Sequence, residues 1–356
     1  MKDKNTKWVV AFIGTFVLIL ALMGGFNAIV DPYFHYHAPL DFVKYELKEE
    51  RYQNNGIVKH FEYDAIITGS SMTQCFKPSE LDALFGVNAV KVPFSGGSYK
   101  EVNDNLEVAF AYNSDIKMVV RCLDVNAMFD DKDLMNYDNC PTYLYDDSVL
   151  NDAGYLFNKD ILVLSVRSLH GYMVDGSGYL SMDDYVNWHG YYTYGEEVVE
   201  ASYNREEVEV AEEQVAITEE EYAIMEATIE QNITSLAAAN PDTEFYIYFS
   251  PYSIYYFDFW YRTGELEKYL LAEKFYIEKL LEYDNIHVYS FFEDYESICN
   301  PDYYRDLAHH NGDLHTKILQ WMSEGKYEIT KENYEEHYQA IHDFYMNYDY
   351  DALFAE

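Results

Sequence analysis

Cysteine is scarce in this sequence, and its absence from motifs limits the chemistry that the chain can perform. Only four cysteines (Cys75, Cys122, Cys140 and Cys299) are spread over 356 residues, and their spacing matches no metal-binding motif. Four scattered thiols in a chain of this length do not indicate a disulfide scaffold, although one bridge between an unspecified pair remains open. No D-x-D-x-D-G calcium loop is present either. The sequence therefore predicts neither a metal nor another cofactor.

Basic residues are also few. The chain has 24 Lys and Arg against 63 Asp and Glu, which gives a formal net charge of −39 and a pI near 4.4. Such a surface repels a phosphate backbone, so nucleic acid is excluded as a partner. Apolar residues make up 49% of the chain, enough to bury a core of one large α/β domain or two small ones.

One long apolar run lies at the N-terminus, from Trp8 to Val30. It is long enough to cross a hydrocarbon layer of about 30 Å as a helix. Lys2, Lys4 and Lys7 precede it, which favours a cytoplasmic N-terminus and an extracellular C-terminal domain at the cell membrane. A cleaved signal peptide is the alternative, but the run exceeds a usual signal core and no clear A-x-A site precedes Asp31. We predict an uncleaved single-pass anchor over residues 1–30.

The rest of the chain alternates between short β-branched runs and longer helical patterns. Residues 31–60 are interpreted as a stalk, residues 61–326 as an α/β domain with an insertion at about 127–215, and residues 327–356 as an acidic, Tyr-rich tail. Strand, helix and strand at this spacing predict a parallel five-stranded sheet with helices on both faces. The strands are predicted at residues 64–68, 88–92, 116–123, 243–249 and 285–291, and the main helices at 78–85, 98–112, 160–170, 217–239, 264–283 and 311–322.

Polar residues follow several of these strands, and functional groups in parallel sheets gather at the carboxyl ends of the strands. A serine at a sharp turn, a downstream Asp/His pair, glycines with free N–H groups and a side-chain amide are together typical of a serine hydrolase. The residues concerned are Gly69, Ser70, Ser71, Ser95, Gly96, Gly97, Asp124, Asn126, Asp306, His309 and His310.

Three motifs in this order resemble the SGNH/GDSL hydrolase superfamily: Ile67-Thr68-Gly69-Ser70-Ser71-Met72, Pro93-Phe94-Ser95-Gly96-Gly97 and Asp306-Leu307-Ala308-His309. More specifically, it resembles the membrane-anchored branch, which includes the D-alanine transfer protein of teichoic acid synthesis and alginate O-acetylation proteins. The resemblance covers roughly residues 60–322 and implies a three-layer, flavodoxin-like domain. It also implies a serine esterase or O-acyltransferase that acts on a cell-envelope polysaccharide or polymer, with a membrane-bound acyltransferase as a partner.

The same resemblance implies the role of each residue. Ser71 would be the nucleophile, His309 its general base and Asp306 the residue that orients His309. The backbone N–H groups of Ser71 and Gly96, with the Asn126 side chain, would form the oxyanion hole.

The sequence departs from the family pattern in ways that leave alternatives open. Gly-Ser-Ser replaces Gly-Asp-Ser, so Ser70 competes with Ser71, and Leu123-Asp124-Val125-Asn126 matches the Gly-x-Asn-Asp block only in part. His310 and His315 are rival bases.

Two other functions compete with catalysis. A catalytically inactive SGNH-like component could bind or assemble an envelope polymer, with the aromatics around Trp260 as a glycan platform or merely as core. A periplasmic-type ligand receptor would require two similar α/β lobes, and only one is evident.

Overall fold

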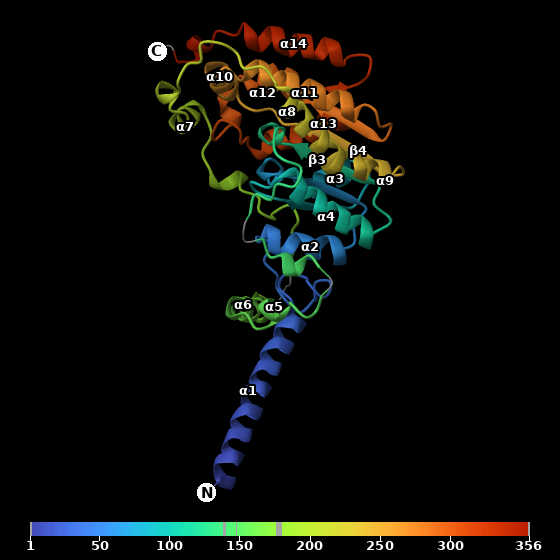
Figure 1. Cartoon of the computed structure of the whole chain (residues 1–356), viewed down its shortest axis with the longest axis vertical. Helices are drawn as coiled ribbons and strands as arrows, with labels where there is room; N and C mark the ends of the chain where they lie inside the picture. Colours follow the sequence, from blue (N-terminus) through green and yellow to red (C-terminus); the bar gives the residue numbers. More distant parts are fainter. Residues whose placement is uncertain (1, 138–139, 147, 176–179, 355–356) are drawn as a thin grey trace. The chain divides into compact units, whose positions relative to one another are not determined.

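The computed structural model describes residues 2–137, 140–146, 148–175 and 180–354, which divide into two compact units (Figure 1). Unit 1 comprises residues 1–61 and 139–181. Unit 2 comprises residues 62–138 and 182–356.

Unit 1 begins with the apolar helix α1 (Lys2–Val30). This helix is long and apolar enough to span a membrane, with a mean hydropathy of 2.5 over its most apolar window and 6% of that window buried. Unit 1 continues with α2 (Glu50–His60), α5 (Ala153–Leu156) and α6 (Lys159–Asp175). The predicted apolar segment is therefore one continuous helix.

Leu144, Tyr155 and Ile161 form a small hydrophobic core in unit 1. Beside it, the fully buried carboxylate of Asp31 accepts hydrogen bonds from the Tyr155 hydroxyl (2.7 Å) and from the backbone N–H of Tyr36 (2.7 Å). Hydrogen bonds of this kind satisfy a charge that would otherwise be costly to bury.

The described residues of unit 2 form one mixed sheet in the order β2-β1-β3-β4-β5-β6. The prediction of five strands is wrong, because a sixth strand pairs antiparallel with β5 at the edge of the sheet. It is two residues long and shows no alternation, so periodicity could not reveal it. The strands are β1 (Ala65–Gly69), β2 (Ala89–Pro93), β3 (Met118–Leu123), β4 (Glu244–Phe249), β5 (Ile286–Ser290) and β6 (Glu328–Ile329).

Every residue of β1, β2 and β3 is buried, as expected for parallel strands covered on both faces. On one face, Arg121 donates to the carbonyls of Tyr99 (3.2 Å) and Asn232 (2.7 Å). On the other face, the strand partner of Cys122 is Tyr248, whose ring contacts Phe76. The α-helices of unit 2 are α3 (Pro78–Phe85), α4 (Tyr99–Tyr112), α7 (Glu196–Ser202), α8 (Glu219–Ile229), α9 (Ser235–Ala239), α10 (Ile254–Arg262), α11 (Leu266–Leu280), α12 (Tyr295–Ile298), α13 (Gly312–Glu324) and α14 (Tyr334–Met346).

The predicted long helix 217–239 is interrupted by a π-helical segment at Glu230–Thr234. The backbone carbonyl of Asn232, in this segment, accepts a hydrogen bond from the guanidinium of Arg121, a residue that is only 2% exposed. In a π-helical turn, some carbonyl groups do not take part in the regular i→i−4 hydrogen bonds of an α-helix. Such a carbonyl group can therefore accept a hydrogen bond from this buried cation.

Helix α14 carries part of the C-terminal tail onto α11, where His337 contacts two carboxylates. Its Nδ1 lies 2.5 Å from Glu293 Oε1, and its Nε2 lies 3.6 Å from Glu273 Oε1. Burial opposes the charged ring, but the two glutamates outweigh burial and raise the pKa of His337 to about 9. His337 is therefore positively charged at neutral pH and holds α14 against the rest of unit 2.

We expect His337→Gln to destabilise the protein in a pH-dependent manner. The pKa rises from 6.5 to about 9 on folding, so the stabilisation is fully present below pH 6.5 and is lost as the pH rises through 9. The shift corresponds to roughly 3 kcal/mol. Urea unfolding in detergent should show this difference at pH 6 and little difference at pH 10; equal differences at both pH values would contradict the ion-pair account.

Candidate active site

The turn after β1 is built around Gly69, whose φ of +147° lies in a region that side chains rarely adopt. A Cβ atom at this position would lie 2.8 Å from Cys122 Cβ and 2.9 Å from Thr73 Cγ2. Ser70 then caps a short 3₁₀ helix (Ser71–Thr73), and its Oγ accepts from the N–H of Met72 (3.3 Å). The glycine lets the chain leave the sheet sharply, and this turn presents Ser71 at the carboxyl edge.

Gly69→Ala is expected to lower the free energy of unfolding by about 2–4 kcal/mol, because it adds both backbone strain and steric overlap. Gly86→Ala is the matched control: Gly86 also has a positive φ (+70°), but a Cβ atom there would meet nothing within 4 Å. That variant should cost only about 1 kcal/mol. If chemical denaturation shows equal losses in the free energy of unfolding for the two variants, the close contacts around Gly69 contribute nothing to the difference.

Three of the predicted site residues lie in one hydrogen-bonded chain. Ser71 Oγ is 2.8 Å from His309 Nε2, and His309 Nδ1 is 2.9 Å from Asp306 Oδ2. The backbone N–H of His309 also donates to Asp306 Oδ1 (2.7 Å), as does that of Ala308 (3.0 Å). The carboxylate therefore holds both the ring and the backbone of the histidine.

The electrostatics of Asp306 favour its charged form. Burial raises the pKa of this carboxyl, but hydrogen bonds from the ring and backbone of His309, the charge of His309 and the N–H of Ala308 outweigh burial. The net pKa lies below the ordinary value, and Asp306 is an anion at neutral pH. An anion here stabilises a protonated His309 ring.

The rival residues have other partners. Ser70 Oγ donates to Asp124 Oδ2 (3.0 Å). The fully buried His310 lies 3.1 Å from Ser250 Oγ, and burial lowers its pKa well below the usual value. His315 lies between the carbonyl oxygens of Asn311 and Met72, at 2.8 Å from each, and burial lowers its pKa to about 4. It connects α13 to the Ser71 turn and does not contact the Ser71 hydroxyl.

Gly96 and Asn126 follow the strands on either side of β1. Strand register pairs Gly69 with Pro93, and the N–H of Phe94 donates to the Gly69 carbonyl (2.8 Å), which ties the β2 end to the nucleophile turn. Gly96 is exposed, with φ +60°. Asn126 is also exposed, and the Tyr256 hydroxyl donates to its Oδ1 (2.7 Å), which fixes the amide so that its NH₂ group is the free end.

The aromatic side chains that lie over His309 were not among the predicted site residues. The Trp188 ring lies edge-on to His309 at a centroid distance of 5.9 Å, and its Nε1–H donates to Gln74 Oε1 (2.8 Å). The Arg305 guanidinium lies 4.2 Å from the Trp188 ring and 4.1 Å from the Tyr192 ring, and its Nε is 3.4 Å from Asp306 Oδ2. The only signal was the richness of the insertion in aromatic residues.

The aromatics around Trp260 were interpreted either as a glycan platform or as core, and Trp260 belongs to the core. It is 1% exposed and packs against Tyr256 and Tyr269, so this aromatic group belongs to the core. Tyr252, nearby, donates its hydroxyl to Asp124. Cys75 is a buried thiol, and burial raises its pKa to about 11, so it is unreactive at neutral pH.

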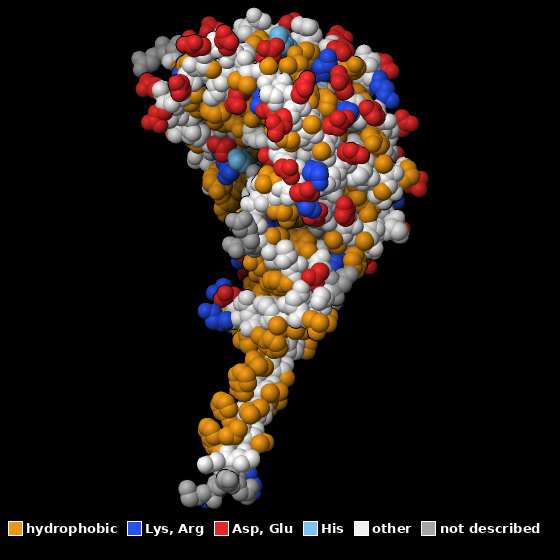
Figure 2. Space-filling view, in the orientation of Figure 1, with side chains coloured by type: hydrophobic (Ala, Val, Ile, Leu, Met, Phe, Trp, Pro, Cys, Tyr) orange, Lys and Arg blue, Asp and Glu red, His pale blue; other side chains and the backbone are white. Residues whose placement is uncertain are grey.

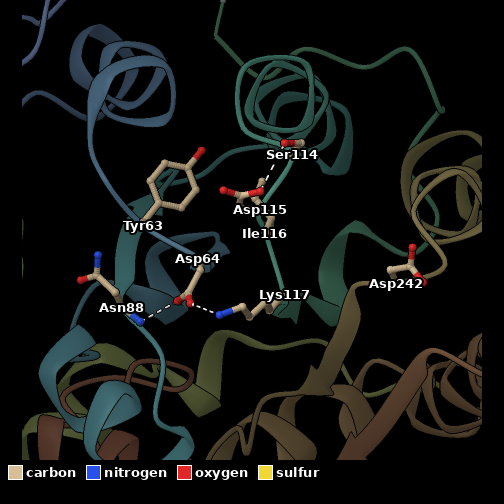
Figure 3. Close-up of a pocket in the computed structure, with 8 residues that line it drawn as sticks. All are labelled: Tyr63, Asp64, Asn88, Ser114, Asp115, Ile116, Lys117 and Asp242. Atoms are coloured by element: carbon tan, nitrogen blue, oxygen red, sulfur yellow. Dashed lines mark hydrogen bonds and ion pairs between the residues drawn. The ribbon is translucent and has the colours of Figure 1, made fainter.

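A separate pocket lies at the amino ends of the strands, opposite the end that carries Ser71 (Figure 3). Its lining residues precede the strands, and they include Asp64, Lys117 and Asp242. Lys117 Nζ forms an ion pair with Asp64 Oδ2 (2.7 Å). The pocket therefore does not belong to the Ser71 site.

No protein-family model matches the chain, and no curated protein matches it. Among solved structures, one provisionally described as a platelet activating factor from Streptococcus pneumonia matches with 14% identity and a TM-score of 0.40. The match covers 77% of this chain and 88% of that chain. The site is therefore interpreted from its own geometry.

Proposed function

We propose that this chain is a membrane-anchored serine esterase or O-acyltransferase whose nucleophile is Ser71. The observation that carries the proposal is the continuous hydrogen-bonded chain Ser71–His309–Asp306, with distances of 2.8 Å and 2.9 Å. Two segments of the sequence, one with Ser71 and one with both Asp306 and His309, meet only through the fold, and each residue has the chemistry that its position requires.

In the proposed reaction, His309 Nε2 takes the proton of the Ser71 hydroxyl as Oγ attacks the acyl carbonyl carbon. The tetrahedral intermediate collapses when the bond to the leaving alkoxide breaks, and His309 returns the proton to that oxygen. An ester on Ser71 remains. Water or a sugar hydroxyl, deprotonated by His309, then attacks the carbonyl carbon of this ester. The bond to Ser71 Oγ breaks and His309 returns the proton to Oγ, so that water yields the free acid and the sugar hydroxyl yields an acylated sugar.

The negative charge that develops on the carbonyl oxygen requires hydrogen-bond donors. The backbone N–H groups of Ser71 and Gly96 and the side-chain amide of Asn126 are the groups that we assign to this role. The Tyr256 hydroxyl supports the assignment of Asn126, because it occupies the acceptor end of the amide.

The acyl acceptor or donor that we infer is a cell-envelope polysaccharide or related polymer. The proposal is supported by α1, which would hold the catalytic unit close to the membrane. Lys2, Lys4 and Lys7 favour a cytoplasmic N-terminus and an extracellular C-terminal domain. Because cytoplasmic acyl donors would not reach that side directly, a membrane-bound acyltransferase is the partner that we propose.

Mass spectrometry of envelope polymer from cells that make the full chain tests this function. Ser71→Ala should change the acyl content: accumulation of acyl groups indicates an esterase, and their loss indicates a transferase. Ser323→Ala, at an exposed position on α13, is the control and should match the wild type. If Ser71→Ala also matches the wild type while deletion of the whole chain alters the polymer, the chain acts as a non-catalytic component.

A further inference from the structure

Helix α6 has an apolar face that none of the residues described by the structure covers. Its buried side is formed by Ile161, Ser165 and Ser168. The opposite side exposes apolar side chains at helical spacing, and their exposed fractions are large: Val163 43%, Val166 51%, Met173 67% and Val174 67%. A soluble helix normally shows the reverse pattern, with polar groups outward.

The α5–α6 junction packs against α1 near the end of the apolar run. The Asn27 side chain donates to the Leu156 carbonyl (2.9 Å), and the Phe157 ring lies against Gly24, where a Cβ atom would be 3.0 Å away. Phe157 is nevertheless 44% exposed. From this junction, α6 runs across the direction of α1 rather than along it (Figure 1).

The position of this junction along α1 sets its depth. A hydrocarbon layer of about 30 Å takes roughly 20 helical residues at 1.5 Å each. Counted from Trp8, after the last lysine, such a span ends near Asn27. Phe157 contacts Gly24, which is one turn before that boundary, and α6 therefore leaves α1 among the outer acyl groups, just below the lipid headgroups.

The charge distribution agrees with this placement. By sequence, unit 1 has nine Lys and Arg and eleven Asp and Glu, a net charge of −2, so −37 of the total of −39 belongs to unit 2. Figure 2 shows many acidic side chains on the visible face of unit 2 and few on that of unit 1. A nearly neutral surface avoids the repulsion that a strongly acidic one would meet at anionic lipids.

The exposed face of α6 also carries Arg167, His170 and Lys159, and Lys159 lies 4.0 Å from Asp160 with both side chains 86% exposed. Asp175, at the end of the helix, is paired with Lys44. Basic groups beside apolar side chains are typical of helices that lie in a membrane interface.

We propose that α6 is an interfacial membrane helix, which places Phe157, Val166 and Met173 among the outer acyl groups of the leaflet and Arg167 among the phosphates. The occupant of the exposed face is the lipid surface. This inference rests on the proposed membrane anchoring by α1. It makes α6 a second attachment, so that unit 1 is held against the bilayer rather than suspended from a single helix.

Fluorescence quenching in lipid nanodiscs tests this placement on the full chain. A bimane label is introduced at Val166→Cys or Met173→Cys in a background with Cys140→Ser and Cys299→Ser, and quenched by lipids that carry a nitroxide near the headgroup. Phe16→Cys, within α1, reports insertion of the anchor. Val215→Cys, an exposed site on unit 2, is the negative control.

We expect labels at Val166 and Met173 to lose most of their fluorescence, with shallow nitroxides quenching more than deep ones and Val215 unaffected. Arg167→Glu should weaken the quenching at Val166 in anionic nanodiscs more than in zwitterionic ones. Quenching at Phe16 without quenching at Val166 overturns the inference and leaves the anchor intact; shielding of Val166 only when a membrane partner is added would assign the face to a protein. Absence of quenching at Phe16 instead refutes the anchor.

Discussion

Replacing His309 with alanine is expected to lower kcat for hydrolysis of a small activated ester by about 10⁶-fold. His309 Nε2 lies 2.8 Å from Ser71 Oγ, so the variant removes the group that accepts the serine proton and later protonates the leaving oxygen. A serine hydroxyl without a base is a poor nucleophile at neutral pH. Steady-state kinetics of the detergent-solubilised full chain measure the loss.

His310→Gln is the matched comparison, because His310 is adjacent in sequence but bonded to Ser250 inside the core. That variant should keep most of its activity per folded molecule, although burial of a different side chain will lower its stability. If His310→Gln loses activity and His309→Ala does not, the assignment of the base is wrong.

Asp306→Asn is expected to lower kcat by about 10⁴-fold. The carboxylate accepts from His309 Nδ1 (2.9 Å) and from the backbone N–H of His309 (2.7 Å). An asparagine keeps the size of the side chain but loses the negative charge that stabilises the imidazolium formed in the transition state. The measurement is kcat as a function of pH, because Asp306, with its depressed pKa, stays ionised as the pH falls toward 5.

Asp302→Asn controls for the loss of one acidic group on the same segment, since the Asp302 side chain is exposed and four residues away. It should behave as the wild type. Asp306→Asn should also unfold at nearly the wild-type temperature. A variant that loses activity only because it unfolds would indicate a structural role for Asp306 in place of the proposed positioning role.

The elements with strong periodicity were predictable. Helix α3 occupies the predicted residues 78–85, and the predicted strands at 64–68, 88–92, 116–123, 243–249 and 285–291 overlap β1 to β5. Long β-branched runs and capped helices carry this information locally. Strand β6 could not be read, because a two-residue pair is defined by its neighbour β5 and not by its own sequence.

The candidate site likewise has one part that could be predicted from the sequence and one part that could not. Ser71, Asp306 and His309 follow from motifs at the ends of strands, and topology brings such ends together. The cover of Trp188, Tyr192 and Arg305 depends on how the insertion returns to the loop that precedes α13. No periodicity or motif spacing in the sequence predicts this contact. Only the structure shows that Trp188 and Tyr192 pack against the arginine next to Asp306.

Labelling by a fluorophosphonate probe tests the central claim most directly, because the probe reacts only with a serine that a base has activated. We predict that the wild-type chain is labelled, that Ser70→Ala is still labelled and that Ser71→Ala is not. Mass spectrometry of the labelled peptide should place the adduct on Ser71 Oγ. An adduct on Ser70, or a folded wild-type chain that takes up no probe, would contradict the proposed nucleophile.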